Sequence, residues 1–273
     1  MCAGDEEGVD RDTGAVHVRF YAELGDFLAP GQRGREFQHA CPAGNAVKDL
    51  IEGLGVPHTE VDLVLVNGRP VDFSHKLRDG DRVSVYPVFE ALDISTVTAV
   101  RPEPLRMVRF AADVHLGRLA GYLRLAGFDT LYRDDWSEQE LAAIAVRERR
   151  ILLTRDRGLL MRAVVTHGHL VRVTRPRAQL REILDHFDLW RSLRPFSRCS
   201  VCNDLVEEVS KADVEAWLPP RTAAHYEEFR RCPGCGRIYW QGAHYRSLLE
   251  LFSPGGGSSE PDQPVSGVAA GPG

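Results

Sequence analysis

Apolar and polar residues alternate through the first third of the chain in the pattern of half-buried β-strands. The pattern predicts strands over residues 16–21, 36–41, 61–66 and 82–88. Between the second and third strands, residues 47–54 show helical spacing, with Asn45 placed to cap the helix and Gly55 to end it. Asn67 and Gly68 form the favoured two-residue turn of a β-hairpin. The order β-β-α-β-β predicts a small α+β domain.

From residue 105 to about residue 190, short apolar runs alternate with segments of helical periodicity. Strands are predicted over residues 107–111, 130–132, 151–154 and 170–173. Helices are predicted over residues 116–123, 137–145 and 159–165, with a further helix after the last strand. Strands and helices that alternate in this way form a parallel sheet covered by helices, so this segment is predicted to be an α/β domain.

Four cysteines near the end of the chain form two C-x-x-C pairs, Cys199 with Cys202 and Cys232 with Cys235, separated by 29 residues. Each pair can offer two thiolates, and two pairs complete the tetrahedral shell of a structural zinc ion. Gly236 allows the tight turn that aims amide groups at the sulfurs. Two disulfides or a redox motif are the alternatives, but a second dithiol at matching spacing does not suit a redox motif.

Charge divides the chain of 273 residues. Residues 1–100 carry 9 basic and 17 acidic side chains, whereas residues 101–252 carry 25 and 20. Arginine outnumbers lysine 31 to 3, as in a GC-rich genome, so an arginine cluster alone is not evidence for nucleic-acid binding. The first residues are acidic rather than signal-peptide-like, and no apolar run could cross a bilayer, so we expect a cytoplasmic protein without a membrane partner.

Three segments are predicted to lie outside the folded domains. Residues 1–14 and the glycine-rich tail, residues 253–273, are predicted to be disordered. Residues 93–104 are predicted to form an extended linker, because Pro102 and Pro104 push the preceding residues away from helix.

Two motifs give the first domain a resemblance to known proteins. Val-Asn67-Gly68-Arg-Pro-Val and Leu77-x-Asp-Gly-Asp81-x-Val resemble ubiquitin-like β-grasp domains of the sulfur-carrier type, such as the small subunit of molybdopterin synthase. Those carriers act through a free C-terminal Gly-Gly, which the last strand here lacks, so sulfur transfer is not expected. A role in docking a protein partner or positioning a substrate and a passive stabilising role both stay open.

Acidic residues follow the first three strands of the α/β segment. They are Asp113 after the first strand, Asp134 and Asp135 after the second, Glu138 in the next helix and Asp156 after the third strand. Ligands of parallel sheets bind beyond the carboxyl ends of the strands. Carboxylates that converge there without basic partners repel one another, and bound Mg²⁺ or Mn²⁺ relieves the repulsion. Two such ions suit the hydrolysis of a phosphodiester bond.

Each of these acids also has a structural explanation. Asp113 could cap its helix, Glu138 could favour the helix dipole, and Asp134 and Asp135 could be solvated loop residues. Asp156 is hardest to explain without a metal, because it directly follows an apolar strand.

Other polar residues lie near the acids in the sequence. Glu140 is three residues after Ser137, so it is predicted to complete a capping box rather than to bind metal. Arg118, Arg155 and Arg157 could bind phosphate groups of a substrate, or they could neutralise the acids in the absence of metal.

The motifs of the α/β segment give a specific resemblance. Arg109-Phe-Ala-Ala-Asp113-x-x-Leu-Gly-Arg118 and Arg150-Ile-Leu-Leu-Thr-Arg-Asp156, followed by the four-cysteine ribbon, resemble bacterial relatives of the Mut-seven C-terminal RNase domain, a PIN-like nuclease family. In that family a ubiquitin-like module usually precedes the nuclease domain. The resemblance therefore implies a ubiquitin-like domain over residues 15–92, a PIN-like domain over residues 105–190 and a zinc ribbon with a helical insert over residues 191–252.

The resemblance also implies Mg²⁺-dependent cleavage of RNA, with the catalytic acids carried over to Asp113, Glu138 and Asp156. Relatives often have Asp where this chain has Glu138, and Asp134 and Asp135 lie close by, so the identity of the second metal-binding acid stays open. In the ribbon, the segment from Arg237 to Trp240 joins basic and aromatic side chains that could stack on RNA bases. Alternatively, Ile238 and Trp240 could lie in a strand that packs on the main domain.

The sequence thus predicts a metal-dependent ribonuclease with structural zinc, catalytic Mg²⁺ or Mn²⁺, and RNA as its partner. The alternative is a non-catalytic RNA- or ribosome-binding adaptor, in which the acids hold no metal. A toxin of a toxin–antitoxin pair is disfavoured, because the accessory domains would have no obvious use there.

Overall fold

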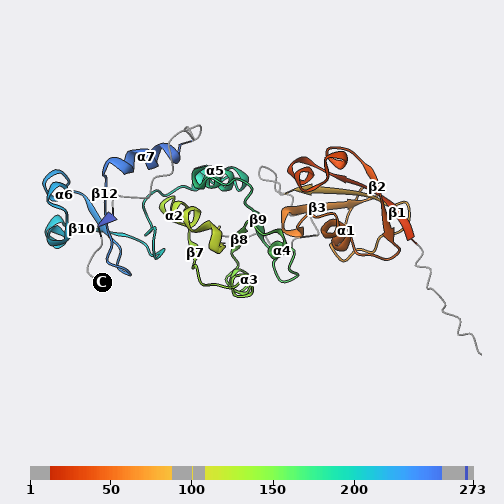
Figure 1. The fold of residues 1–273 in the computed structure, drawn as a ribbon, viewed down its shortest axis with the longest axis horizontal. Coiled ribbons are helices and arrows are strands. Elements are labelled where there is room, and N and C mark those ends of the chain that lie inside the picture. Colours follow the sequence, from red (N-terminus) through yellow and green to blue (C-terminus); the bar gives the residue numbers. More distant parts are fainter. Residues whose placement is uncertain (1–12, 88–99, 101–107, 254–267, 270–273) are drawn as a thin grey trace, which may run out of the picture. The chain divides into compact units, whose positions relative to one another are not determined.

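The computed structural model describes residues 13–87, 100, 108–253 and 268–269 (Figure 1). The predicted disordered and linker segments lie almost entirely outside these described residues. The chain forms two compact units. The first contains Met1–Pro104 with Leu160–Thr166, and the second contains Leu105–Leu159 and His167–Gly273.

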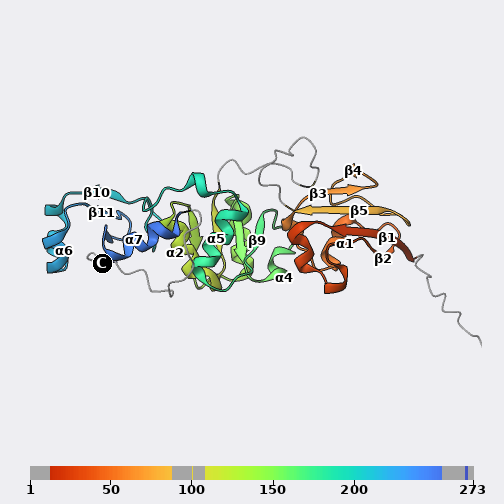
Figure 2. The same cartoon turned by 90° about the horizontal axis from the view of Figure 1, so that it is seen from above.

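The first unit is built on a five-stranded sheet with the strand order β2-β1-β5-β3-β4 (Figure 2). Its strands are β1 (Thr13–Phe20), β2 (Phe37–Pro42), β3 (Val61–Val66), β4 (Arg69–Pro70) and β5 (Arg82–Pro87). β1 pairs with β5 in parallel, and the other neighbours are antiparallel. The helices are α1 (Val47–Gly53) and three 3₁₀ turns at Ala22–Phe27, Pro30–Gln32 and His58–Glu60. The predicted α+β order is confirmed.

The hairpin turn of the first unit is confirmed, but the start of α1 is not. Asn67 and Gly68 both have positive φ, 50° and 78°, as the favoured two-residue turn requires. The predicted capping role of Asn45 is wrong, because Ala46 is the N-cap and no side chain caps the helix. The backbone of Ala46 instead pairs with Lys76 just before the helix begins.

The second unit contains a four-stranded parallel sheet with the order β7-β6-β8-β9. The strands are β6 (Phe110–Ala112), β7 (Thr130–Tyr132), β8 (Ile151–Thr154) and β9 (Gly168–Leu170). The helices are α2 (Gly117–Leu125), α3 (Glu138–Arg147), α4 (Arg157–Leu160) and α5 (Pro176–His186), with 3₁₀ turns at Val114–Leu116 and Trp190–Ser192. The prediction of an α/β sheet is confirmed.

Successive side chains of a strand point to opposite faces of the sheet, so the core of the second unit has two parts, one on each face. Phe110 and Ala112 belong to the cluster formed with α2 and α5, whereas Ala111 between them does not. Figure 1 shows α2 and α5 on one side of the sheet and α3 on the other. This three-layer arrangement buries both faces, as a parallel sheet requires.

Two predicted elements of this unit are displaced. The helix expected over residues 159–165 is the shorter α4, which begins at Arg157 because the Asp156 side chain accepts a hydrogen bond from Gly158 at its first turn. The last strand, expected over residues 170–173, is β9 and ends at Leu170, because Glu182 accepts the amides of Arg172 and Val173 that a sheet would have used.

The C-terminal part of the second unit forms a separate antiparallel sheet with the order β10-β11-β12-β13. Its strands are β10 (Glu207–Val209), β11 (Phe229–Arg231), β12 (Ile238–Trp240) and β13 (Val268–Ala269). The helices are α6 (Pro220–His225), α7 (Ala243–Leu251) and 3₁₀ turns at Lys211–Asp213 and Glu215–Trp217. The predicted helical insert thus contains β10, two 3₁₀ turns, the short helix α6 and β11. Within the described part of the chain, no helix is long and apolar enough to span a membrane.

Candidate functional site

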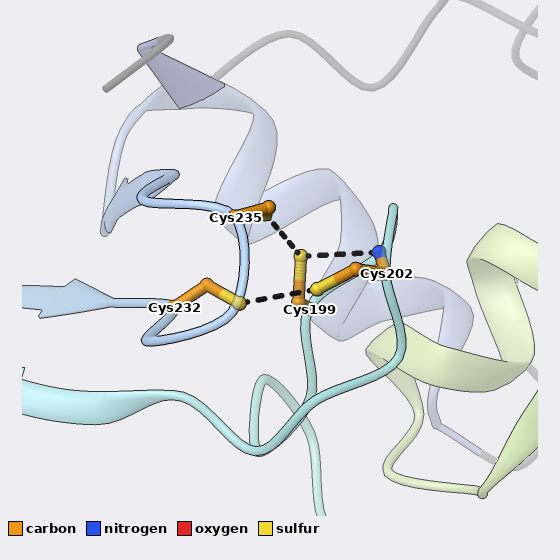
Figure 3. Close-up of side chains that lie close together, drawn as sticks. All are labelled: Cys199, Cys202, Cys232 and Cys235. Atoms are coloured by element: carbon orange, nitrogen blue, oxygen red, sulfur yellow. Dashed lines mark hydrogen bonds between the residues drawn. The ribbon is translucent and has the colours of Figure 1, made fainter. Parts of the chain in front are cut away.

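The four predicted metal ligands lie together at the tips of two loops (Figure 3). The Sγ atoms of Cys199, Cys202, Cys232 and Cys235 all lie within 4.8 Å of one another. Cys199 and Cys235 Sγ are 3.5 Å apart, and Cys202 and Cys232 Sγ are 3.2 Å apart. A tetrahedral shell with Zn–S bonds of about 2.3 Å places its sulfurs about 3.8 Å apart. The four thiols therefore fit one ion with little movement.

The two cysteine loops have the same backbone design. In each, the residue after the second cysteine donates its amide to the carbonyl of the first: Asn203 to Cys199 (3.0 Å) and Gly236 to Cys232 (2.9 Å). Asn203 and Gly236 both adopt positive φ, 75° and 72°. The glycine was expected from the sequence, but its asparagine counterpart was missed, although Asn is the residue that most readily replaces Gly in this conformation.

One thiol of the cluster is set apart by its hydrogen bonds. Burial alone would raise the pKa of Cys199, but the amide of Cys202 and the Tyr239 hydroxyl, 3.0 Å from the sulfur, lower this pKa to about 7. Burial raises the pKa of Cys202 to about 11. A metal ion requires thiolates from both residues, so Cys199 is the ligand already prepared for binding.

The aromatic segment of the ribbon packs inward and is not an exposed stacking surface. Ile238 is fully buried, and Tyr239 is 9% exposed, with its hydroxyl on the Cys199 sulfur. Trp240 is half-buried against the small core of the ribbon. The segment is therefore a packed strand, as the alternative expected, but it packs in the core of the ribbon itself and not on the main domain.

In the parallel sheet, Asp113 lies at the carboxyl end of the central strand β6 and is only 5% exposed. Its Oδ2 accepts a hydrogen bond from the Thr154 hydroxyl (2.7 Å), and its amide donates to the carbonyl of Leu153 (3.0 Å). No described Lys, Arg or His forms a salt bridge with it. Asp113 is the N-cap residue of the following 3₁₀ turn, but its side chain forms no capping hydrogen bond there.

Thr154 joins the ends of two neighbouring strands. Its hydroxyl donates to Asp113 and accepts the amide of Asp156 (2.9 Å). Asp156 follows β8 and is exposed, and its Oδ1 accepts the amide of Gly158 (2.6 Å). Sequence reasoning missed Thr154; the available signal was a polar residue at the last position of an otherwise apolar strand.

The two acids after β7 differ in their surroundings. Arg133 donates two hydrogen bonds to Asp135, of 2.8 and 2.5 Å, and lowers the pKa of that carboxyl. Burial, followed by the charges of Asp134 and Asp113, raises the pKa of Tyr132. Tyr132 also donates its hydroxyl to the carbonyl of Val114 (3.2 Å). The negative charges of Asp134 and Asp113 therefore both act on Tyr132, whereas Asp135 is paired with Arg133.

The remaining predicted residues lie on the surface. Glu138 is the exposed first residue of α3, and Arg118, Arg155 and Arg157 are exposed. The predicted capping box is confirmed: Glu140 donates its amide to the Ser137 hydroxyl oxygen and accepts the Ser137 amide (2.8 Å).

The acids are not gathered as closely as the thiols. Among the described residues, no three of Asp113, Asp134, Asp135, Glu138 and Asp156 bring ligand oxygens within 4.8 Å of one another. Asp113 is nevertheless a buried carboxylate held by one hydroxyl, and a buried charge without a cation is costly. The donor set of this rim, all oxygen, suits Mg²⁺ or Mn²⁺.

Comparison with known proteins confirms the resemblance that the motifs indicated. The family model described as Mut7-C RNAse domain matches residues 108–252, and the model described as Mut7-C ubiquitin matches residues 13–93. A solved structure from Pyrococcus furiosus, described as subunit 1 of a molybdopterin converting factor, is 28% identical; the match covers 27% of this chain and 97% of that chain, with a TM-score of 0.23. No curated protein matches the chain.

Proposed function

This chain belongs to the Mut7-C RNAse domain family, and we propose that it is a metal-dependent ribonuclease that hydrolyses RNA phosphodiester bonds at the carboxyl edge of its parallel sheet. The observation that carries the proposal is Asp113, a carboxylate 5% exposed at the end of the central strand, which forms no ion pair with a cationic side chain among the described residues. A bound divalent ion would supply the missing positive charge.

Asp113 and Asp156 would hold the ion, with Asp134, Asp135 or Glu138 completing the site. Of these three, Asp135 is the least suited, because Arg133 already binds its carboxylate. When bound, one or two Mg²⁺ or Mn²⁺ ions would activate water and stabilise the charge that develops on the phosphate. Thr154 would keep Asp113 oriented.

The exposed arginines would bind the RNA backbone. Arg118, Arg155 and Arg157 lie next to the rim in the sequence, and a guanidinium can donate two parallel hydrogen bonds to phosphate oxygens. None of the described ion pairs joins Arg118 or Arg155 to a rim acid, which favours phosphate binding over neutralisation of the acids.

The four thiols would hold a structural zinc ion, since a closed four-sulfur shell leaves no position for water or substrate. Zinc held by reduced cysteines suits a cytoplasmic protein. The ubiquitin-like unit would dock a protein partner, as its family match favours.

The test of the proposed function is digestion of labelled single-stranded and structured RNAs with and without Mn²⁺. We expect cleavage that requires the ion and is lost in Asp113→Asn but kept in Glu140→Ala, which removes only a helix cap. Cleavage by Asp113→Asn at the parental rate would reject the proposal.

A non-catalytic RNA-binding adaptor is the second candidate. It is favoured by the pairing of Asp135 with Arg133 and by the capping of α4 by Asp156, since both acids have a use without metal. RNA binding of equal strength in the parent and Asp113→Asn, with no cleavage by either, would establish it.

A further inference from the structure

A buried arginine of the nuclease fold reaches into the first cysteine loop. Arg124 belongs to α2 and is 5% exposed. Its Nη1 donates to the carbonyls of Ser200 (3.1 Å) and Val201 (2.6 Å), the two residues between Cys199 and Cys202. Its Nε donates to the carbonyl of Thr130 at the start of β7 (2.9 Å). One guanidinium thus joins a helix, a strand and the metal loop.

The charge of Arg124 is opposed by burial and favoured by the cysteines. Burial lowers its pKa, and the charges that oppose this lowering most are those of Cys199 and Cys202. A zinc ion bound by four thiolates carries a net charge of about −2, and a partly buried charge of this size requires compensation. Amide groups and the Tyr239 hydroxyl provide only partial charges at Cys199. Arg124 provides a full positive charge.

Asn203 binds the other end of the same loop to the nuclease fold. Asn203, directly after Cys202, accepts the Thr130 amide (3.0 Å) and donates to the Asp129 carboxylate (2.8 Å). Asp129 in turn forms a salt bridge with Arg150, which is 6% exposed (2.7 Å). Both polar groups of the Thr130 backbone are therefore bound by residues that hold the cysteine loop.

The second cysteine loop has the same backbone turn without this connection. Gly236 stands where Asn203 stands in the first loop, and it has no side chain that could bind the nuclease fold. The Asn203 side chain is therefore not needed to form the turn. It connects the loop to β7.

We infer that Arg124 is a positioning residue for the zinc centre: it balances the charge of the tetrathiolate and, with Asn203, couples metal binding to the docking of the ribbon on β7. The inference rests on a metal in the four-thiolate site and not on ribonuclease activity. Its test can therefore succeed or fail independently of the proposed function.

The first experiment measures zinc affinity of the full chain by competition with a chromogenic chelator. Outer contacts of metal ligands typically contribute 10- to 100-fold to metal affinity, so Arg124→Met should lose about that factor. Arg124→Lys keeps the charge and should recover part of the loss. The matched control is Arg109→Met, which removes a half-buried arginine of the same sheet region, bound to the Glu148 carbonyl (2.8 Å), without touching the loop. Parental affinity in folded Arg124→Met, or an equal loss in Arg109→Met, would overturn the inference.

The second experiment does not depend on the stability of an Arg124 variant. Asn203→Gly keeps the positive-φ turn, as Gly236 does, but removes both side-chain bonds to the nuclease fold. In the parent, removal of zinc by the chelator should increase hydrogen exchange at the Thr130 amide. In Asn203→Gly this amide should already exchange fast with zinc bound. If the exchange rate of the Thr130 amide in the parent is the same with and without zinc, metal binding and the docking contact are independent, and the inference is wrong.

Discussion

The two candidate metal sites of the second unit differ in how closely their side chains are gathered. The thiols of the ribbon lie within 4.8 Å of one another, whereas the acids of the nuclease rim form no such group among the described residues. The thiols come from two loops whose turns each form by local hydrogen bonds. The acids come from the ends of three strands and the start of a helix, so their separation depends on the whole sheet. A closed site can be folded in advance, whereas an open site must leave space for ligands.

The largest expected effect comes from breaking the closed site. Cys232→Ser should abolish zinc binding and lower the melting temperature strongly, because metal binding contributes on the order of 10–16 kcal/mol in model zinc peptides. Elemental analysis of the parent should give about one zinc per chain, as one four-sulfur shell predicts. Cys41→Ser is the control, since Cys41 is also a buried thiol but lies outside the cluster. A zinc content that survives in Cys232→Ser would contradict the assignment.

A substitution in the acidic rim should reduce RNA cleavage without lowering the melting temperature. Asp113→Asn should reduce Mn²⁺-dependent RNA cleavage by roughly two orders of magnitude or more. The melting temperature of the metal-free protein should stay the same or rise, because a buried carboxylate without a cation is replaced by a neutral amide. Cleavage assays and thermal melts on the same preparations provide the measurement. A large fall in stability together with lost activity would indicate a structural role for Asp113.

Sequence spacing predicted most local features, although Asn45 does not cap α1 as it indicated. It predicted the cysteine cluster, the Asn67-Gly68 turn and the capping box at Ser137. It failed where a distant side chain competes for backbone groups: Glu182 takes the amides that would have extended β9. No local pattern could show that competition, because Glu182 and Val173 meet only after α5 has packed on the sheet.

The same reasoning explains what was missed at the two sites. Thr154 and Arg124 both act on atoms distant in the sequence, the Asp113 carboxylate and the carbonyls of Ser200 and Val201. Thr154 is marked in the sequence only as a polar residue at the end of an apolar strand, and nothing in the sequence indicates which atoms either residue contacts. They become visible only when the strand ends and the cysteine loop are placed in space.

A smaller effect should distinguish the two acids after β7. Asp134→Asn should raise the Mn²⁺ concentration needed for half-maximal cleavage and should move the pKa of Tyr132 back toward its ordinary value, because one of the charges that raise it is removed. Asp135→Asn should change neither, since Asp135 is bound to Arg133. Metal titrations and absorbance titration of the tyrosine would measure the two effects. The reverse ranking of the variants would assign the metal to Asp135.

The smallest expected effect lies in the capping box of α3, which borders the rim but should not take part in its chemistry. Hydrogen bonds from Ser137 lower the pKa of Glu140, so the folded state binds its proton less readily than the unfolded state. The contribution to stability is therefore present above the unfolded pKa and is lost as the pH falls through the lower, folded pKa. Glu140→Ala should melt slightly below the parent at pH 7, and the difference should shrink in acid. Ser137→Ala should cost about 1 kcal/mol as the loss of an N-cap. Melting curves at pH 7 and in acid, with cleavage assays at pH 7, would check this, and a loss of cleavage in Glu140→Ala would move this residue from the cap into the metal site.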